Sequence, residues 1–290
     1  MCYNVIILNT DKSKTQNIGE LLTYIFESYR YNHDGAFIYN STNRQYVRTL
    51  NYEEFKQILR NQVLGYGYVH MHLRLASHGS INESNIHGWE IGGYLCSHNG
   101  SYFNGSMSYL PSQLPSRQLV SNDNTDSYQF FMTNKSEINQ GKISKINVNG
   151  FFGVAFCTPK NNDSKMILIS KNKSIKVYKY HGLLIFSNEP LDFVYRPIEF
   201  GGFKFDNVVK SEVENEILLY DFKKLKVVKR RKVHEIKYNY YYPFYGDNIY
   251  YKSTSDKDKD IDTNDLENFS YRCKEVNGEL ECRWEFDSGD

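Results

Sequence analysis

The chain has 290 residues, of which 40% are hydrophobic and 16% aromatic. This composition excludes an intrinsically disordered protein, because enough apolar surface is present to form a packed core. The formal net charge of +1 argues against nucleic acid or an anionic membrane as the partner.

The N-terminal part of the chain alternates helix and strand patterns. Leu21, Leu22, Ile25 and Phe26 recur at the spacing of an amphipathic helix. Short apolar or β-branched runs predict strands. We therefore expect helices at 18–29 and 52–61 and strands at 5–8, 36–39, 46–50 and 67–73, with the second and third strands joined as a hairpin.

From residue 151 to residue 233 the sequence is a succession of short strand patterns separated by turn residues. A few early helices followed by many strands favour an α+β fold with antiparallel sheets. A polar, charge-rich stretch at 253–264 is the best candidate for a linker. The expected strands cover 152–156, 166–170, 175–178, 183–186 and 217–220.

Cysteine usage and the lack of targeting patterns point to the cytoplasm. The cysteines are odd in number and scattered, unlike a secreted disulfide framework. No apolar stretch approaches the roughly 18 residues of a membrane span, and the first residues lack the basic and apolar regions of a signal peptide. We expect a reduced cytoplasmic protein that does not enter a membrane. Heavy use of Asn, Lys, Ile and Tyr is typical of an AT-rich genome, such as that of a virus or phage.

Cys2 is the first candidate for catalysis. Removal of Met1 would leave Cys2 with a free α-amine, whose pKa of about 7.7–8.0 suits a base near neutral pH. Such a residue combines a thiol nucleophile with its own base, as terminal-nucleophile enzymes do. The alternative is a small buried residue at the start of the first strand.

Three further polar segments stand out. Each has an ordinary structural interpretation: Arg74 as a surface charge, Asn99-Gly100 as a type I′ hairpin turn, and Asp126 as a helix N-cap. The segments are His72-Leu73-Arg74-Leu75-Ala76-Ser77-His78-Gly79, Ser97-His98-Asn99-Gly100 and Asn124-Thr125-Asp126-Ser127.

Taken together and in order, these segments and Cys2 resemble the glutaminase domain of class II glutamine amidotransferases, N-terminal nucleophile hydrolases such as that of glucosamine-phosphate synthase. That family has a Cys after Met, then H-x-R-x-[AS]-[ST]-H-G, an H-N-G turn and T-D-[TS]. The resemblance covers residues 2–230, and the stretches at 150–156 and 184–189 also fit it loosely.

The resemblance implies a division of roles in glutamine hydrolysis. The Cys2 thiolate attacks the side-chain carbonyl, and the Asn99 amide with the Gly100 backbone N–H stabilises the oxyanion. Arg74 binds the α-carboxylate through its planar fork, and Asp126 pairs with the α-ammonium. Ammonia leaves, and the γ-glutamyl thioester is hydrolysed to glutamate; no cofactor and no metal are implied. The remaining expected substrate-binding residues are His78, Gly79 and Thr125.

The sequence departs from the family pattern before the strand at 36–39. The family has R-G-x-D-[SA]-[AG] there, whereas this chain has Tyr31 in the position of the Arg. Arg30 could take over that role from one residue away; otherwise activity is reduced. Leu75 replaces a common aromatic residue, and retention of Met1 would block the α-amine.

The resemblance also implies a fold and partners. We expect an α+β fold, a four-layer αββα sandwich of two antiparallel sheets between helices, with a C-terminal β-hairpin extension. The amidotransferase domain would span 2–232, followed at 233–290 by a Tyr-rich segment, a charged linker and the hairpin. Too few residues follow residue 230 for a synthase domain, so we expect a separate ammonia-acceptor protein or a homo-oligomer. A free glutaminase, or an enzyme acting on a γ-glutamyl compound, is the other option.

Two other functions fit parts of the sequence. A catalytically inactive protein of the same fold, used for binding or assembly, for example in a virus particle, would account for the missing Arg. Metal binding is a further alternative, because closely spaced histidines on a strand can hold zinc. No CxxC accompanies the histidines, so we expect packing or turn roles for most of them. They are His70, His72, His78, His87 and His98.

The C-terminal part is not explained by the resemblance. Residues 223–237 hold eight basic side chains against one acidic one, and a Tyr-rich stretch follows at 238–245. A protein-docking surface, a single-stranded nucleic acid surface and a solvated strand edge are the open interpretations.

The last segment has the pattern of a β-hairpin. Asn277-Gly278 predicts a two-residue turn, which places Cys273 opposite Cys282 and Tyr271 opposite Trp284. An isolated hairpin is marginal in water, so the apolar face of this one has to pack on something. The two thiols could form a disulfide, but free thiols are expected in a reducing cytoplasm.

Overall fold

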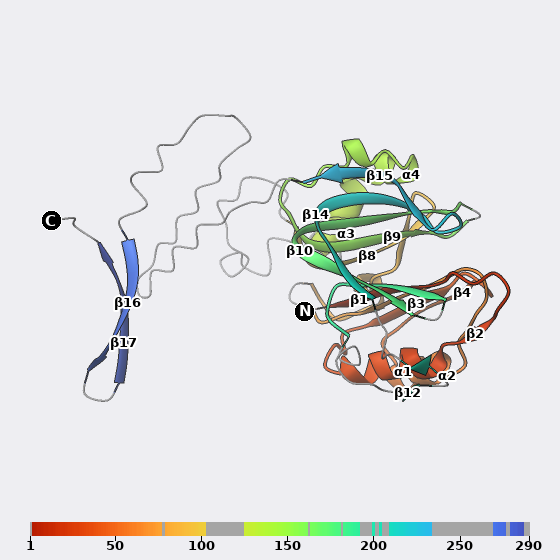
Figure 1. The fold of residues 1–290 in the computed structure, drawn as a ribbon, viewed down its shortest axis with the longest axis horizontal. Helices are drawn as coiled ribbons and strands as arrows, with labels where there is room; N and C mark the ends of the chain where they lie inside the picture. The colour runs from red at the N-terminus through yellow and green to blue at the C-terminus, as the bar shows by residue number, and fades with distance from the viewer. Residues whose placement is uncertain are drawn as a thin grey trace. The chain divides into compact units, whose positions relative to one another are not determined.

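The computed structural model describes residues 2–76, 79–102, 125–161, 163–180, 182–191, 199–200, 203–204, 209–233, 269–276 and 279–286. The chain separates into two compact units, Met1–Tyr251 and Lys252–Asp290 (Figure 1).

The larger unit consists mostly of β-strands. Its helices are α1 (Gly19–Ser28), α2 (Tyr52–Arg60), α3 (Asp126–Thr133) and α4 (Lys135–Asn139), with 3-10 turns η1 (Glu83–Asn85) and η2 (Ile143–Lys145). Its strands are β1 (Tyr3–Asn9), β2 (Gln16–Asn17), β3 (Ala36–Asn40), β4 (Gln45–Thr49), β5 (Val63–Leu64), β6 (Tyr68–Leu73), β7 (Trp89–Ile91), β8 (Tyr94–Tyr102), β9 (Phe151–Pro159), β10 (Lys165–Tyr180), β11 (Leu183–Ser187), β12 (Glu199–Phe200), β13 (Phe203–Lys204), β14 (Val209–Asp221) and β15 (Lys226–Lys232).

The elements expected near the N-terminus are confirmed. Helix α1 buries Leu21, Leu22, Ile25 and Phe26, the four residues at helical spacing. Helix α2 starts after Asn51, whose side chain accepts a hydrogen bond from the backbone of the first turn. Strands β3 and β4 form the expected hairpin.

The expected α+β fold, a four-layer αββα sandwich of two antiparallel sheets between helices, is wrong, because the protein is mostly β. The main strands form one large antiparallel sheet, which curls into a half-barrel with few helices. Its order is β4-β3-β6-β1-β11-β10-β9-β8-β7, and β14 and β15 extend it from β10. The sheet is continuous because β11 pairs with both β1 and β10, which joins the strands of the N-terminal part to the later ones.

Strand β10 is the element that makes the single sheet possible. Two separate strands were predicted at 166–170 and 175–178, but β10 runs through both. Its first half pairs with β9 and its second half with β11. The register against β14 shifts between Ser170 and Ser174, where Asn172 adopts a left-handed φ of 55°. A bulge of this kind bends a strand.

Three clusters of buried apolar side chains stabilise the curled sheet. One lies between helices α1 and α2 and strands such as β1, β3 and β6. A second lies between α3 and strands β8, β9 and β10. The third fills the inside of the curl, where Ile6 and Phe37 belong to the same cluster as Phe156 and Leu168. The two halves of the sheet therefore share one interior.

The smaller unit contains the hairpin of β16 (Phe269–Val276) and β17 (Glu279–Phe286). Its register pairs Cys273 with Cys282 and Tyr271 with Trp284, as predicted. The expected linker at 253–264 and the Tyr-rich stretch at 238–245 lie outside the described residues. In the part of the chain that the structure describes, no helix combines the length and the apolar character needed to cross a membrane.

Strand β15 carries the basic residues at 226–232. All but one of its residues are exposed, and among the described strands it pairs with β14 alone. Arg230 forms an ion pair of 3.3 Å with Glu216 on β14. Lysine-rich exposed edge strands resist pairing with other chains, which is the interpretation that this geometry favours for the basic stretch.

Candidate active site

Cys2 immediately precedes β1 and is held by backbone groups from another part of the chain. The pairing of β1 with β6 aligns Tyr3 with Leu73, so Cys2 lies beside the segment that follows β6. Its sulfur lies 3.5 Å from both the backbone N and the carbonyl O of Leu75. Cys2 as a whole residue is half-buried.

The electrostatic surroundings of Cys2 are mixed in sign. Desolvation raises the pKa of the thiol, while the hydrogen bond from the Leu75 backbone and the positive charge of Arg74 oppose the increase. The Asp126 carboxylate raises it further. A thiol with a raised pKa is mostly protonated near neutral pH, so it needs a base before it can act as a nucleophile.

Arg74 is buried at 2% exposure, so the interpretation as a surface charge is wrong. Its Nη1 donates to the carbonyl oxygens of Ser80 and Asp34 at 3.0 and 3.4 Å. Desolvation lowers its pKa, and the Cys2 thiol and the carboxyl groups of Asp34 and Asp126 counteract that effect. Because a guanidinium stays protonated in proteins, Arg74 supplies a fixed positive charge within electrostatic range of the thiol.

Helix α3 contributes Asp126. The N-cap of α3 is Thr125, whose Oγ1 accepts from the backbone of Tyr128 at 3.2 Å, so Asp126 is not the cap. Asp126 lies one residue inside the helix, and its Oδ2 accepts from the backbone N–H of Tyr102 at 2.8 Å. This bond fixes the carboxylate against the end of β8.

Gly79 lies between Thr125 and Arg74. A Cβ built on Gly79 would lie 3.2 Å from Cγ2 of Thr125 and 3.6 Å from Nη2 of Arg74. Its φ of 79° is a left-handed conformation that favours glycine. Arg74, Gly79 and Thr125, three of the residues expected to bind substrate, are therefore neighbours. His78, another of the expected residues, lies outside the described residues.

Asn99 and Gly100 lie inside strand β8, so the hairpin-turn interpretation is wrong. Gly100 faces Gly153 across the β8–β9 pair, and a Cβ on Gly100 would collide with the carbonyl oxygen of Phe152. Asn99 is 2% exposed, and its Nδ2 donates to Oε1 of Glu189 at 3.4 Å.

Sequence reasoning assigned no role to two acidic side chains of this region. Asp34 is buried, and its Oδ2 accepts from the backbone N–H of Ala76 at 2.6 Å, which fixes the segment after Arg74. The Asp of the family pattern R-G-x-D could have pointed to it. Glu189, which contacts Asn99, lies in a stretch that fits the family only loosely.

Two positively charged side chains near this region differ in where they lie. Arg30, the expected substitute for the family arginine, is exposed and its guanidinium lies over the Tyr31 ring, 5.4 Å from the centroid. It does not take that place in the site. Lys173, in the bulge of β10, is half-buried and an electrostatic neighbour of Cys2 and Glu189. No local sequence pattern indicated Lys173.

Four histidines of the described region, His70, His72, His87 and His98, belong to the core. His70 bonds to Oγ1 of Thr158 at 2.9 Å and to Oγ of Ser97 at 2.6 Å, and His72 stacks on His87 with centroids 4.0 Å apart. Burial lowers the pKa of His70 to about 3 and that of His98 to about 4. Among the described residues, no group of His, Cys, Asp and Glu side chains is arranged to hold a metal ion.

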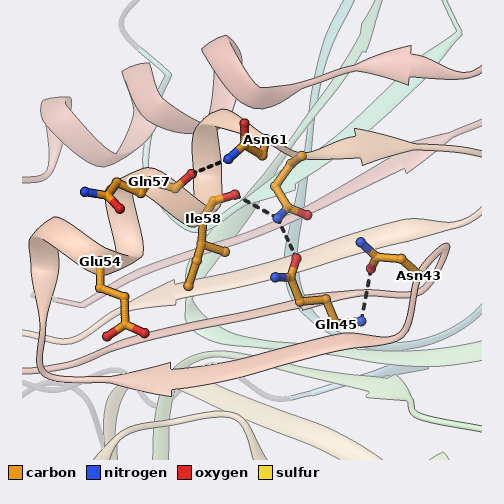
Figure 2. A pocket seen from close by; sticks show the side chains of 7 residues that line it. Asn43, Gln45, Glu54, Gln57, Ile58 and Asn61 are labelled. Atoms are coloured by element: carbon orange, nitrogen blue, oxygen red, sulfur yellow. Dashed lines mark hydrogen bonds between the residues drawn. The ribbon is translucent and has the colours of Figure 1, made fainter.

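A separate cavity of about 420 Å³ lies between α2 and the β3–β4 hairpin (Figure 2). None of the expected site residues lines it, and its lining offers no thiol, imidazole or cation. It therefore provides no nucleophile. The lining residues are Asn43, Gln45, Glu54, Gln57, Ile58, Asn61 and Gln62.

Comparison with known proteins adds no identification, since no protein-family model and no curated protein matches the chain. Any function must be inferred from the site itself.

Proposed function

We propose that the chain is a glutamine-hydrolysing enzyme whose nucleophile is the thiol of Cys2, made N-terminal by removal of Met1. One observation carries the proposal. The Leu75 backbone holds the Cys2 sulfur, and the buried guanidinium of Arg74 and the Asp126 carboxylate both lie within electrostatic range of it.

The opposite charges of Arg74 and Asp126 suit a free amino acid. A guanidinium binds a carboxylate through two parallel hydrogen bonds, and a carboxylate pairs with an ammonium group. The two side chains would hold the α-carboxylate and the α-ammonium of glutamine, which leaves its side-chain amide to reach the sulfur. Because Arg74 is buried, its charge is screened less by solvent than that of an exposed residue.

The chemistry would proceed through a thioester. The α-amine of Cys2 accepts the thiol proton, and the thiolate attacks the amide carbon to form a tetrahedral oxyanion. The Asn99 amide and the Gly100 backbone N–H would stabilise that charge. The C–N bond breaks as the nitrogen takes up the proton, and ammonia leaves. Water then hydrolyses the γ-glutamyl thioester, which yields glutamate and restores the thiol.

The fate of ammonia is part of the proposal. Ammonia would pass to a separate acceptor protein or act within a homo-oligomer, and free glutaminase activity or a γ-glutamyl substrate remains the alternative. A catalytically inactive binding or assembly protein is the second candidate function. One observation favours it: Tyr31 occupies the place of the family arginine, and Arg30 points to the surface instead.

Mass spectrometry and a glutamine-like diazo-ketone distinguish these two functions. For the enzyme we expect intact protein lacking Met1, labelling of Cys2 by the diazo-ketone, and release of glutamate and ammonia from glutamine. Cys2→Ala should abolish labelling and turnover, whereas Cys96→Ala, which removes a fully buried thiol, should keep both. Retention of Met1 together with absence of labelling would establish the non-catalytic alternative.

A further inference from the structure

The turn after β11 connects two parts of the proposed site. In this turn, Asn188 Nδ2 donates to the carbonyl oxygen of Cys2 at 3.1 Å, and Asn188 Oδ1 accepts from the backbone N–H of Asn4. Asn188 is 5% exposed. The turn therefore holds the backbone on both sides of Tyr3, at the start of β1.

Glu189 extends the same turn toward Asn99. Its Oε1 accepts from Nδ2 of Asn188 at 3.2 Å and from Nδ2 of Asn99 at 3.4 Å. The backbone of Glu189 is fixed by Ser187, whose Oγ lies 2.7 Å from the Glu189 carbonyl oxygen and 3.3 Å from its backbone nitrogen. Oε1 of Glu189 thus accepts hydrogen bonds from two amides. One is that of Asn188, which bonds to the Cys2 backbone, and the other is that of Asn99, the proposed oxyanion donor.

The carboxylate determines which way the Asn99 amide faces. An asparagine amide has a donating NH2 end and an accepting oxygen end, and a carboxylate can only accept. If the amide were turned by 180°, its oxygen would face the Glu189 carboxylate and the two acceptors would repel. Anchoring Nδ2 to Glu189 uses one N–H and leaves the other N–H on the same nitrogen for a substrate oxygen.

The Asn99–Glu189 bond is long for a hydrogen bond. Such contacts in a site without substrate often shorten when substrate binds. Glu189 is also an electrostatic neighbour of Lys173, whose pKa is lowered by desolvation and raised in part by this carboxylate. The nearby positive charge compensates the negative charge of Glu189, so the carboxylate can lie close to a developing oxyanion.

We propose that Glu189 is a positioning residue, which fixes the Asn99 amide with its N–H toward the reacting carbonyl. This inference rests on the proposed glutamine hydrolysis and deepens it. Glu189 forms no bond to substrate in this proposal and acts entirely through Asn99.

The test is a double-mutant cycle on glutamine hydrolysis. Removal of an oxyanion donor costs about 100–1000-fold in kcat, so we expect Asn99→Ala to fall in that range and Glu189→Ala to lose about 10–100-fold in kcat. KM should change little, because Arg74 and Asp126 are untouched. In the Asn99→Ala background, Glu189→Ala should cost less than about threefold, because its effect passes through the missing amide.

Glu189→Gln is the conservative variant. Its side-chain oxygen can still accept from Asn99, so it should recover most of the lost kcat, and it also covers the case in which Glu189→Ala fails to fold. The rate of Cys2 alkylation by iodoacetamide, which needs no oxyanion donor, should stay within about twofold in all variants. Independent, multiplicative losses from Asn99→Ala and Glu189→Ala would overturn the inference.

Failure of the proposed function would look different. In that case the unmodified protein itself would show no glutamine turnover and no labelling by the diazo-ketone. An active unmodified protein whose kcat is unchanged by Glu189→Ala would leave the proposed function standing and refute the role of Glu189.

Discussion

At the scale of single residues, the candidate site consists of polar side chains that are buried yet individually bonded. Arg74, Asn99 and Asp34 are each nearly inaccessible. Arg74 donates to a backbone carbonyl, Asn99 donates to the Glu189 carboxylate, and Asp34 accepts from a backbone N–H. Buried polar groups are expensive unless satisfied. Their satisfaction here keeps donors and charges fixed around Cys2 before any substrate arrives, which is what electrostatic catalysis requires.

The buried histidines should make stability depend on pH. Burial lowers the pKa of His70 to about 3 and that of His98 to about 4, whereas a histidine in an unfolded chain titrates near about 6.5. The unfolded chain therefore takes up protons first as the pH falls below about 6.5, and stability declines from there down to the folded-state pKa values. As the pH falls from 7.5 to 5.5, each of the two histidines should lower the free energy of unfolding by about 1.3 kcal/mol.

Urea unfolding at several pH values measures this effect. His70→Gln should reduce the pH dependence, because an amide can bond to Thr158 and Ser97 without titrating. His33→Asn is the matched control, since His33 is exposed and its removal leaves the core unchanged. Equal urea midpoints at pH 7.5 and 5.5 would show that the core histidines do not influence stability.

Gly100 should tolerate no side chain. Gly100→Ala would push a methyl group against the Phe152 carbonyl and within 2.8 Å of the Gly153 Cα. Gly141→Ala is the control, because Gly141 also has a positive φ, of 60°, but its Cβ would meet Leu219 methyl groups at ordinary contact distances. We expect Gly100→Ala to lower the free energy of unfolding, measured in urea, by about 2 kcal/mol more than the control substitution does. Equal losses would mean that β8 and β9 can move apart at this point.

At the scale of elements, local sequence patterns predicted the individual helices and hairpins well, but they did not predict the pairings between distant segments. The helices near the N-terminus and the β3–β4 hairpin follow from periodicity and turn residues that act within a few positions. The continuity of β10 through Asn172 depends on Asn215, whose Oδ1 accepts from the Asn172 backbone at 2.7 Å. No sequence pattern near the bulge predicts that contact. For the same reason Glu189 could not be linked to Asn99 from the sequence.

Helix α3 should depend on the hydroxyl of Thr125. Loss of an N-cap side chain costs about 1 kcal/mol, so we expect Thr125→Ala to lower the free energy of unfolding by about that amount and to loosen the turn that presents Asp126. Thr125→Ser keeps the acceptor for Tyr128 and should stay close to the unmodified protein in thermal unfolding. If Ser and Ala destabilise equally, the methyl group packed near Gly79 matters more than the cap.

At the scale of the whole molecule, the family resemblance led to the wrong architecture. The strands are antiparallel, but the resemblance implied an α+β fold with two separate sheets between helices, whereas the larger unit is mostly β with few helices. The pairings of β11 with β1 and β10 join all main strands of the larger unit into one curled sheet. Pairings between residues as distant as Val5 and Ser187 leave no trace in local periodicity, so composition and motifs could not decide between one sheet and two.

A single sheet with a shared interior should make the larger unit unfold cooperatively. Trp284→Phe leaves Trp89 as the only tryptophan, because the chain has two. Trp89 lies in the cluster of α3, β8 and β9, whereas Leu59 and Ile25 lie in the cluster of α1 and α2. In this background, Leu59→Ala should lower the free energy of unfolding by about 2–5 kcal/mol, and Ile25→Val should lower it by about 1 kcal/mol. Because the sheet couples the two regions, Trp89 fluorescence should report both losses in full and should coincide with far-UV circular dichroism. A Trp89 transition unaffected by either substitution would mean that the two halves of the sheet unfold separately, despite the hydrogen bonds between β11 and its neighbours.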